Sequence, residues 1–280
     1  MSNGIIIFDK PTGMTSRQVD NAVMKWLGER KVGHLGTLDP FATGVFVVAV
    51  GRATKFLRYL GGEKKSYLAR LKLGESTSTL DRDGEVTGTM EVPHLDRRTV
   101  CKALSGFLGE SMQTPPAYSA KKVNGVASYE LARKGEEASL SPRRIFVYDV
   151  NLLQMQPPYI DFSLTVSEGT YIRVIGDELA RKLGTLGHLE ALRRLSIGNI
   201  SLESAVSFTP SSCCKLLDPA PFVELPAYEL SAEQSALVDN GVRLCLQSDE
   251  PRLLLQDRSG KAKAVYVKQG DAYVCERGLQ

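Results

Sequence analysis

One segment of the chain combines ionisable side chains with a backbone that a ligand can approach closely. Residues 33–44 read GHLGTLDPFATG and contain three glycines, His34 and Asp39. Glycine lets the backbone adopt positive φ and come near a bound group, and Pro40 biases Asp39 away from the helical conformation. A carboxylate held on such a loop is well placed to act on a substrate.

Local physics alone leaves three interpretations of this loop. A phosphate-binding loop is disfavoured, because no Gly-Lys-Ser/Thr sequence follows. The loop is otherwise a structural turn in which Asp39 caps backbone amides, or it carries a catalytic aspartate; composition does not separate these two. We find no serine or cysteine elbow. Asp81 and Asp83 are distant from Asp39 in sequence, so a two-carboxylate glycosidase is possible only if folding brings a second carboxylate close to Asp39.

Two further patterns are relevant to binding, an arginine that can pair with a carboxylate and a basic stretch that can bind phosphates. Glu168–Arg173 opens a predicted helix. An arginine on a first helical turn pairs bidentately with a buried carboxylate, or it is an ordinary surface arginine; local physics leaves both interpretations open. Residues 52–74 contain seven Lys and Arg against one Glu, although the whole chain carries a net charge of only +3. Such a stretch is either an electrostatic footprint for a phosphate backbone or a solvated surface.

Six segments, in this order along the chain, resemble motifs of the B-type tRNA pseudouridine synthases. The stretches are Lys10–Ser16, Gly33–Pro40, Lys65–Tyr67, Thr114–Ala120, Gly169–Arg173 and Leu192–Leu195. The resemblance implies isomerisation of uridine-55 in the T loop of tRNA. Guide-RNA-dependent archaeal and eukaryotic relatives share several of these motifs, but the short chain and the segment at 114–120 favour the stand-alone bacterial type.

The resemblance also implies roles for individual residues. Asp39 is expected to be the catalytic carboxylate, which attacks C1′ of the ribose or removes the C2′ proton. Tyr67 is expected to stack on the target base and suits proton abstraction from C5. Arg173 is expected to pair with Asp39 and keep it ionised. His34 is expected to contact the RNA near the flipped nucleotide, and the uridine pocket is expected to be lined by Tyr67, Tyr171 and Leu192.

Binding must compensate for extruding a nucleotide, which costs a few kcal/mol; stacking on an aromatic ring returns about 1–3 kcal/mol per base. The side chains expected to hold the RNA backbone are Arg52, Lys55, Lys64, Lys65, Lys121, Lys122, Arg143 and Arg144. Isomerisation involves no net redox change, so we expect no cofactor. The three histidines lie far apart and no CxxC pair occurs, so we expect no metal.

A second hypothesis is a tRNA-binding or tRNA-folding protein without essential catalysis. The joint presence of Asp39, Tyr67 and Arg173 argues against it, because a pure binding protein does not need all three.

Regular elements must hold these residues in place. Apolar runs and alternation predict strands at 5–8, 45–50, 65–73, 145–153 and 159–166. Helical spacing predicts helices at 16–27 (capped by Ser16), 97–108, 170–183 and 188–195, with a helical turn at 128–134. Residues 29–44 and 111–127 are expected to be loops. Short strands at 242–246, 252–255, 262–267 and 272–275 suggest a small β-barrel.

The expected fold class is α+β. The resemblance implies the pseudouridine synthase fold, a mixed and mainly antiparallel sheet with flanking helices, followed by a small PUA-like β-barrel. We expect a catalytic domain at 1–208 with an RNA-gripping insertion at about 110–140, a linker at 209–224 and an RNA-binding domain at 225–280. This last segment has seven basic and eight acidic residues, so a strong electrostatic role is not expected of it.

Cellular setting and partners follow from simple features. The five cysteines lack paired spacing, which favours a reducing compartment. The start of the chain has neither a basic region nor a long apolar run, and no segment has the roughly 18 apolar residues of a membrane span. We therefore expect a cytoplasmic protein that does not bind a membrane. The resemblance implies tRNA as the partner, and we expect a monomer without a protein partner.

Overall fold

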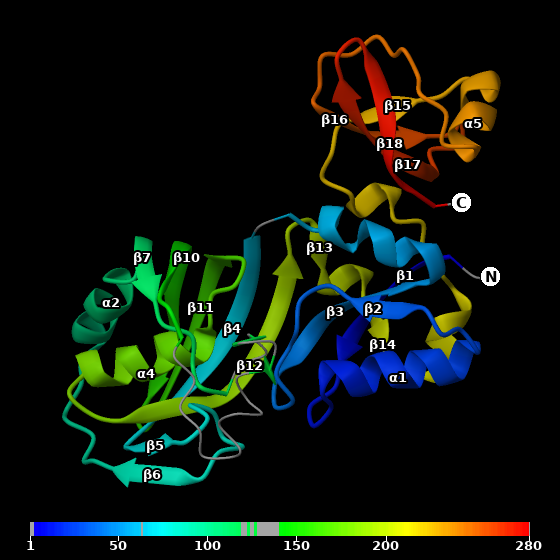
Figure 1. Ribbon diagram of the computed structural model, residues 1–280. Coiled ribbons are helices and arrows are strands. Elements are labelled where there is room, and N and C mark those ends of the chain that lie inside the picture. The colour runs from blue at the N-terminus through cyan, green and yellow to red at the C-terminus, as the bar shows by residue number, and fades with distance from the viewer. Residues whose placement is uncertain (1–2, 63, 119–121, 124–125, 128–139, 280) are drawn as a thin grey trace. The chain divides into compact units, whose positions relative to one another are not determined.

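The computed structural model describes residues 3–279 except 63, 119–121, 124–125 and 128–139. The chain divides into two compact units (Figure 1). Unit 1 comprises Met1–Asp39, Gly44–Gly62 and Gly198–Gln280, and unit 2 comprises Pro40–Thr43 and Glu63–Ile197. Each unit is described by itself.

The sheet of unit 1 is built on two strands that are buried along nearly their whole length. β1 (Gly4–Lys10) runs antiparallel to β3 (Thr43–Val50), from the pair Gly4↔Val50 to the pair Lys10↔Gly44. β2 (Val32–His34) pairs with β3, and β14 (Val206–Ser207) adds to β1 in parallel. The predicted strands at 5–8 and 45–50 are confirmed, while β2 lies inside the segment 29–44 that was expected to be loop.

Helix α1 (Ser16–Leu27) begins one residue away from its predicted cap. The side chain of Thr15 accepts from the Gln18 amide, and the Gln18 side chain accepts in return from the Thr15 amide. This capping box satisfies two donors at the helix start. Ser16 is therefore the first helical residue, and its hydroxyl is used elsewhere. Gly28, at φ 63°, ends the helix.

The remainder of unit 1 begins with the 3₁₀ helix η1 (Gly51–Tyr59) and resumes beyond residue 198. Its short connecting elements are β13 (Ile200–Ser201), η2 (Leu202–Ser204), η3 (Pro210–Cys214) and η4 (Ala220–Phe222). The final part contains β15 (Ala227–Glu229), α5 (Ala232–Asp239), β16 (Arg252–Gln256), β17 (Ala262–Gln269) and β18 (Ala272–Gly278).

These last strands form an open four-stranded sheet in the order β15-β16-β17-β18. The core beneath the sheet includes Leu230, Leu255, Tyr266 and Tyr273. The predicted strands at 252–255, 262–267 and 272–275 are confirmed. The run at 242–246 contributes only a single bridge, from Leu244 to Tyr273.

Unit 2 is an antiparallel sheet in the order β12-β4-β11-β10-β7. The strands are β12 (Gly187–Ile197), β4 (Lys64–Leu73), β11 (Tyr159–Ser167), β10 (Arg143–Gln156) and β7 (Gly109–Gln113). Helices α2 (Arg97–Ser105) and α4 (Ile172–Lys182) lie against one face of the sheet (Figure 1). The alternation predicted for β4 is confirmed, since Tyr67, Ala69, Leu71 and Leu73 are all buried.

Two short hairpins complete unit 2. β5 (Glu75–Thr77) pairs with β6 (Val86–Thr89), and β8 (Lys122–Val123) pairs with β9 (Val126–Ala127). Strands β7, β8 and β9 interrupt the region 111–127, which was expected to be one long loop. The helical turn expected at 128–134 lies outside the described residues.

The helix predicted at 188–195 is wrong, because these residues belong to strand β12. A bulge between Leu189 and Ala191 shifts the alternation of inward-facing and outward-facing side chains along the strand. As a result Leu189 and Leu192, which are three positions apart, are both buried. That spacing imitates the period of a helix. The helix predicted at 97–108 likewise ends early, at Ser105, and Leu108 is exposed.

A search of the described residues finds no helix with both the length and the apolar character needed to cross a membrane.

We predict that Tyr266 makes unit 1 sensitive to alkali. Its buried hydroxyl donates to the Val242 carbonyl oxygen at 3.0 Å, and burial, reinforced by Cys275 and Asp239, raises the pKa of Tyr266 to about 12. In the unfolded chain a tyrosine loses its proton near pH 10. The stabilisation is therefore complete below about pH 10 and is lost as the pH rises towards about 12.

Tyr266→Phe should lower the free energy of unfolding by about 1 kcal/mol at neutral pH. It should also reduce the decrease of that free energy with rising pH in the alkaline range. Urea unfolding at a series of pH values measures both effects, with the exposed Tyr148→Phe as control. An unchanged alkaline slope in Tyr266→Phe would contradict the assignment.

Candidate active site

The loop that carries Asp39 is anchored on both sides of its glycine-rich part. β2 pairs with β3 up to His34↔Val48, and the Leu35 amide continues the ladder by donating to the Val47 carbonyl at 2.9 Å. The buried hydroxyl of Ser16 then donates to the Leu38 carbonyl and accepts from the Leu38 amide, each at 3.0 Å. Asp39, which is half-buried, directly follows this clamped residue.

The N-terminal motif is held by a lysine whose side chain is turned inward. Lys10 has no exposed surface, and its ammonium donates to the carbonyls of Pro11 and Met14 at 2.9 and 2.8 Å. A charged donor bonded to backbone carbonyls fixes the turn that leads into α1. Lys10 thus stabilises the segment that delivers Ser16 to the Asp39 loop.

His34 is oriented by a residue that sequence reasoning missed. Its Nδ1 lies 2.8 Å from Oδ2 of Asp20, a buried carboxylate on α1, and its ring lies over Phe46 with the centroids 5.2 Å apart. Asp20 falls four residues after Ser16 on α1, so both polar side chains share the inward stripe of the helix. A polar residue on that apolar stripe was the available signal.

In unit 2, Arg173 is buried on the first turn of α4. Its guanidinium donates to the carbonyls of Thr79 and Tyr118 at 2.7 and 2.9 Å, and its Nη1 lies 3.4 Å from Oδ2 of Asp81. Asp81 is itself buried, so each charge compensates the desolvation of the other. The turn that follows β5 therefore brings to Arg173 a carboxylate that sequence reasoning had set aside as distant.

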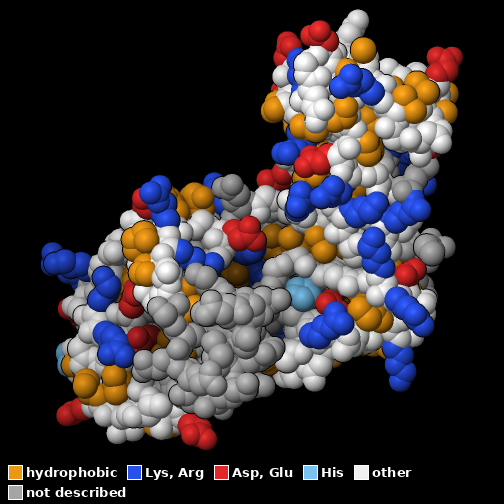
Figure 2. Space-filling view, in the orientation of Figure 1, with side chains coloured by type: hydrophobic (Ala, Val, Ile, Leu, Met, Phe, Trp, Pro, Cys, Tyr) orange, Lys and Arg blue, Asp and Glu red, His pale blue; other side chains and the backbone are white. Residues whose placement is uncertain are grey.

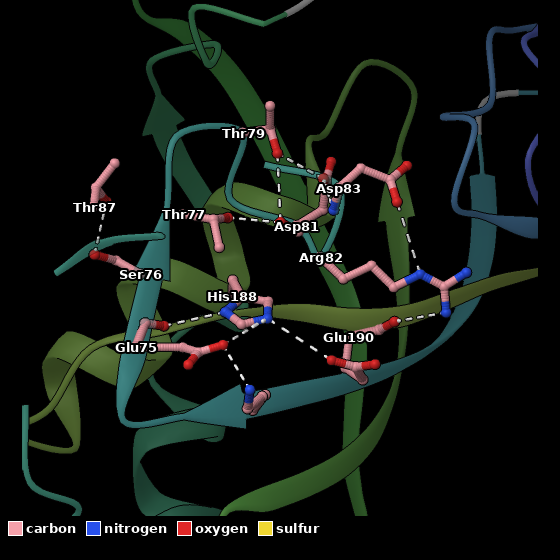
Figure 3. Close-up of polar contacts among 11 residues, drawn as sticks. Glu75, Ser76, Thr77, Thr79, Asp81, Arg82, Asp83, Thr87, His188 and Glu190 are labelled. Atoms are coloured by element: carbon pink, nitrogen blue, oxygen red, sulfur yellow. Dashed lines mark hydrogen bonds and ion pairs between the residues drawn. The ribbon is translucent and has the colours of Figure 1, made fainter. Parts of the chain in front are cut away.

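The turn carrying Asp81 is internally bonded (Figure 3). The Asp81 carboxylate accepts from the Thr79 hydroxyl at 2.6 Å and from the Asp83 amide at 3.1 Å, while the Thr77 hydroxyl donates to the Asp81 carbonyl. A carboxylate that accepts several hydrogen bonds is held in one orientation.

Strand β12 fastens this turn to the sheet. The buried His188 uses Nδ1 to donate to the Glu75 carbonyl at 3.2 Å, and its Nε2 lies 3.8 Å from the carboxylates of both Glu75 and Glu190 (Figure 3). The Leu189 amide donates to the Leu80 carbonyl, and the Leu189 carbonyl accepts from the Arg82 amide. Residues 75–82 are thus held along β12, which fixes two of the three partners of Arg173, Thr79 and Asp81.

The other expected pocket residues of unit 2 lie close to the same strands. Tyr67 on β4 is buried and stands in register opposite Arg194 on β12, which is fully buried; Leu192 is 5% exposed. The Tyr171 amide donates a hydrogen bond to the Gln113 side-chain oxygen at 2.8 Å, and the Gln113 side-chain nitrogen donates to the Tyr171 carbonyl at 3.1 Å. Tyr67, Tyr171, Arg173 and Leu192 therefore belong to unit 2, whereas His34 and Asp39 belong to unit 1.

The residues expected to bind the RNA backbone differ in exposure. Lys and Arg side chains gather over η1 (Figure 2), where Arg52, Lys55 and Arg58 are exposed. Lys64 is exposed with its ammonium 4.5 Å from the Tyr148 ring centroid. The exposed Arg144 pairs with Glu110 at 3.3 Å.

Two members of this set are turned inward. Lys65 is buried and pairs with Glu168 at 3.1 Å; burial lowers the pKa of Lys65 although Glu168 opposes the shift. Arg143 is partly buried and stacks on the Tyr171 ring at 4.7 Å. Lys122 lies on β8, and Lys121 lies outside the described residues.

In the part of the chain that the structure describes, no three His, Cys, Asp or Glu side chains cluster as metal ligands.

Solved structures share the fold of this chain. A solved Cbf5-Nop10-Gar1 complex matches with a TM-score of 0.73 at 22% identity, over 99% of this chain and 85% of the other. An archaeal box H/ACA Nop10-Cbf5 complex matches with a TM-score of 0.71, also at 22% identity, over 99% of this chain and 86% of the other. At this identity the likeness concerns the fold, and it confirms the expected α+β class.

Sequence comparison defines the family. Residues 24–172 match the model described as TruB family pseudouridylate synthase, N-terminal domain. The "tRNA pseudouridine synthase B" of Syntrophotalea carbinolica is 47% identical over 205 residues, 73% of this chain and 67% of that protein. The protein of the same name from Caldanaerobacter subterraneus subsp. tengcongensis is 36% identical over 274 residues, 96% of each.

The chain therefore belongs to the TruB family of pseudouridylate synthases. It is an enzyme of the isomerase class, which converts uridine to pseudouridine. The family expected from the sequence motifs is confirmed.

We predict that Ser16→Ala loosens the Asp39 loop. The buried Leu38 amide and carbonyl would each lose their hydroxyl partner, which should lower the free energy of unfolding by about 1–3 kcal/mol. Hydrogen exchange at the Leu38 amide should accelerate.

The control is Ser105→Ala, which removes only an exposed hydroxyl bonded to the Cys101 carbonyl. Leu38 exchange as slow in Ser16→Ala as in the wild type would show that the hydroxyl does not clamp the loop.

Proposed function

We propose that this enzyme isomerises uridine-55 in the T loop of tRNA, with Asp39 as the catalytic carboxylate. The observation that carries the proposal is the clamp on Leu38, the residue before Asp39. The buried hydroxyl of Ser16 holds Leu38 by two hydrogen bonds. The relatives' name, tRNA pseudouridine synthase B, supports tRNA as the substrate.

The reaction moves a bond without changing the oxidation level of the nucleoside. The bond from C1′ to N1 of uracil breaks, a bond from C1′ to C5 forms, C5 loses its proton and N1 ends protonated. Asp39 acts on the ribose, as carboxylates do in glycosyl chemistry. Tyr67 stacks on the base and takes part in removing the C5 proton.

Arg173 completes the catalytic set in this proposal. We propose that its guanidinium favours the ionised form of the Asp39 carboxylate. An arginine does this best when its orientation is already fixed, and Thr79, Tyr118 and Asp81 bind the guanidinium of Arg173. His34, Tyr171 and Leu192 complete the substrate-binding residues, with His34 contacting the RNA beside the flipped nucleotide.

The rest of the chain is proposed to grip the T stem-loop. Residues 1–208 form the catalytic domain with an RNA-gripping insertion at about 110–140, and residues 209–224 link it to a PUA-like RNA-binding domain at 225–280. Exposed cations bind phosphates in this scheme, whereas the buried Lys65 acts by holding Glu168. The enzyme is proposed to act as a monomer in the cytoplasm without a cofactor.

Asp39→Asn should abolish pseudouridine formation, lowering kcat by at least about a thousandfold, while the affinity for tRNA stays within about threefold of wild type. Tritium release from a transcript labelled at C5 of uridine measures the first effect, and filter binding measures the second. The matched control is Asp149→Asn, which removes an exposed carboxylate on β10 and should leave both values unchanged.

A transcript with cytidine at position 55, labelled at its remaining uridines, tests the target nucleotide and should release no tritium. Turnover by Asp39→Asn at the wild-type rate would exclude Asp39 as the catalytic group. A wild-type enzyme that binds tRNA but forms no pseudouridine would favour the alternative of a tRNA-folding protein.

The cations on η1 should contribute to binding through phosphate contacts. Arg52→Ala combined with Lys55→Ala should weaken tRNA binding and reduce the slope of log affinity against log salt by about 1.4 to 1.8, since each of the two contacts contributes roughly 0.7–0.9. Exposed residues of α2 provide a control with the same change of charge, Arg98→Ala combined with Lys102→Ala. An equal reduction of the slope in both double variants would contradict a specific role for η1.

A further inference from the structure

A carboxylate on α1 is buried although half of it lacks a hydrogen bond. Asp20 is 2% exposed and its Oδ2 bonds His34, but no described residue gives Oδ1 a hydrogen bond. Leaving a buried acceptor unsatisfied costs free energy, and such an atom in a native structure calls for an explanation. Arg17 is no substitute partner, since it lies 3.9 Å from Oδ2 with a largely exposed side chain.

The same contact leaves His34 held in one orientation. Its backbone is paired with β3, its ring lies over Phe46, and its Nδ1 is 2.8 Å from Asp20. The side chain retains 21% of its exposure, and its Nε2 has no hydrogen bond to the described part of the chain. The ring is thus fixed on one side and open on the other.

A carboxylate can only accept hydrogen bonds, so Nδ1 of His34 must carry a proton. The nitrogen left to meet a ligand is then Nε2. Carboxylates orient catalytic and metal-binding histidines in the same way, by fixing which ring nitrogen faces outward.

We propose that Asp20 is a positioning residue that holds His34 with Nδ1 protonated and presents Nε2 to the RNA. Asp20 touches no substrate; it acts through His34. The link between Asp20 and His34 stands on the geometry, whereas its effect on tRNA rests on the function proposed above.

The protonation of Nδ1 is measured by ¹⁵N NMR of protein labelled in its three histidines, at about pH 9, well above the ordinary histidine pKa near 6.5. His34→Ala identifies the resonances of His34. In the wild type Nδ1 should show the shift of a protonated nitrogen, and in Asp20→Leu it should show that of an unprotonated one, because a free neutral imidazole favours the proton on Nε2. An unprotonated Nδ1 in the wild type, or no change in Asp20→Leu, overturns the proposal.

A double-mutant cycle separates positioning from simple support of α1. Asp20→Leu should lower kcat/KM about tenfold and Asp20→Asn less, because the amide oxygen can still accept from Nδ1. In a His34→Ala background, Asp20→Leu should change kcat/KM by less than about twofold. Asn21→Leu, an exposed position on the same helix, is the control and should match the wild type.

An equal loss from Asp20→Leu in both backgrounds would show that Asp20 only supports the helix, and would overturn the proposal. If Asp20→Leu does not fold, Asp20→Asn takes its place in the cycle. If the wild type forms no pseudouridine, the proposed function fails, but the NMR measurement still decides whether Asp20 fixes His34.

Discussion

The buried charge of Arg173 is the constraint that organises unit 2. A guanidinium removed from water is tolerated only when acceptors surround it and an opposite charge stands nearby. Thr79, Tyr118 and Asp81 provide these groups. Two of them lie on the turn after β5, so that turn must keep its shape, and the bonds from β12 at residues 188–190 hold it. The buried guanidinium of Arg173 thereby requires a fixed conformation of the turn after β5 and of its attachment to β12.

Unit 1 holds its loop with hydrogen bonds from side chains to backbone groups instead. Ser16 binds both backbone groups of Leu38, and Lys10 binds the carbonyls of the segment leading to Ser16. Backbone anchoring of this kind restrains the chain next to Asp39 without engaging the carboxylate in the same bonds. A group that must change its bonding during a reaction is better positioned through its neighbours than through itself.

Sequence reasoning succeeded where the signal is local. The alternation of β4 and the apolar runs of β1 and β3 depend on neighbouring residues, and motif resemblance led to the correct family. It failed at 188–195, because the bulge in β12 depends on pairing with β4 and gives a strand the spacing of a helix. It also missed Asp20 and Asp81. Their partners lie 14 residues away for Asp20 and on α4 for Asp81, so only the fold reveals the pairs.

Both omissions have the same physical cause. The motifs supply His34 and Arg173, side chains whose proposed roles need a particular orientation. Each is held by a buried acid outside its motif, Asp20 on α1 and Asp81 on the turn after β5. An orienting group has only to reach the motif side chain, so many positions in the fold can provide it, and its place in the sequence is less restricted. Asp20 and Asp81 are therefore identified by the distance from their carboxylates to the motif side chains in the fold, and not by a sequence signature.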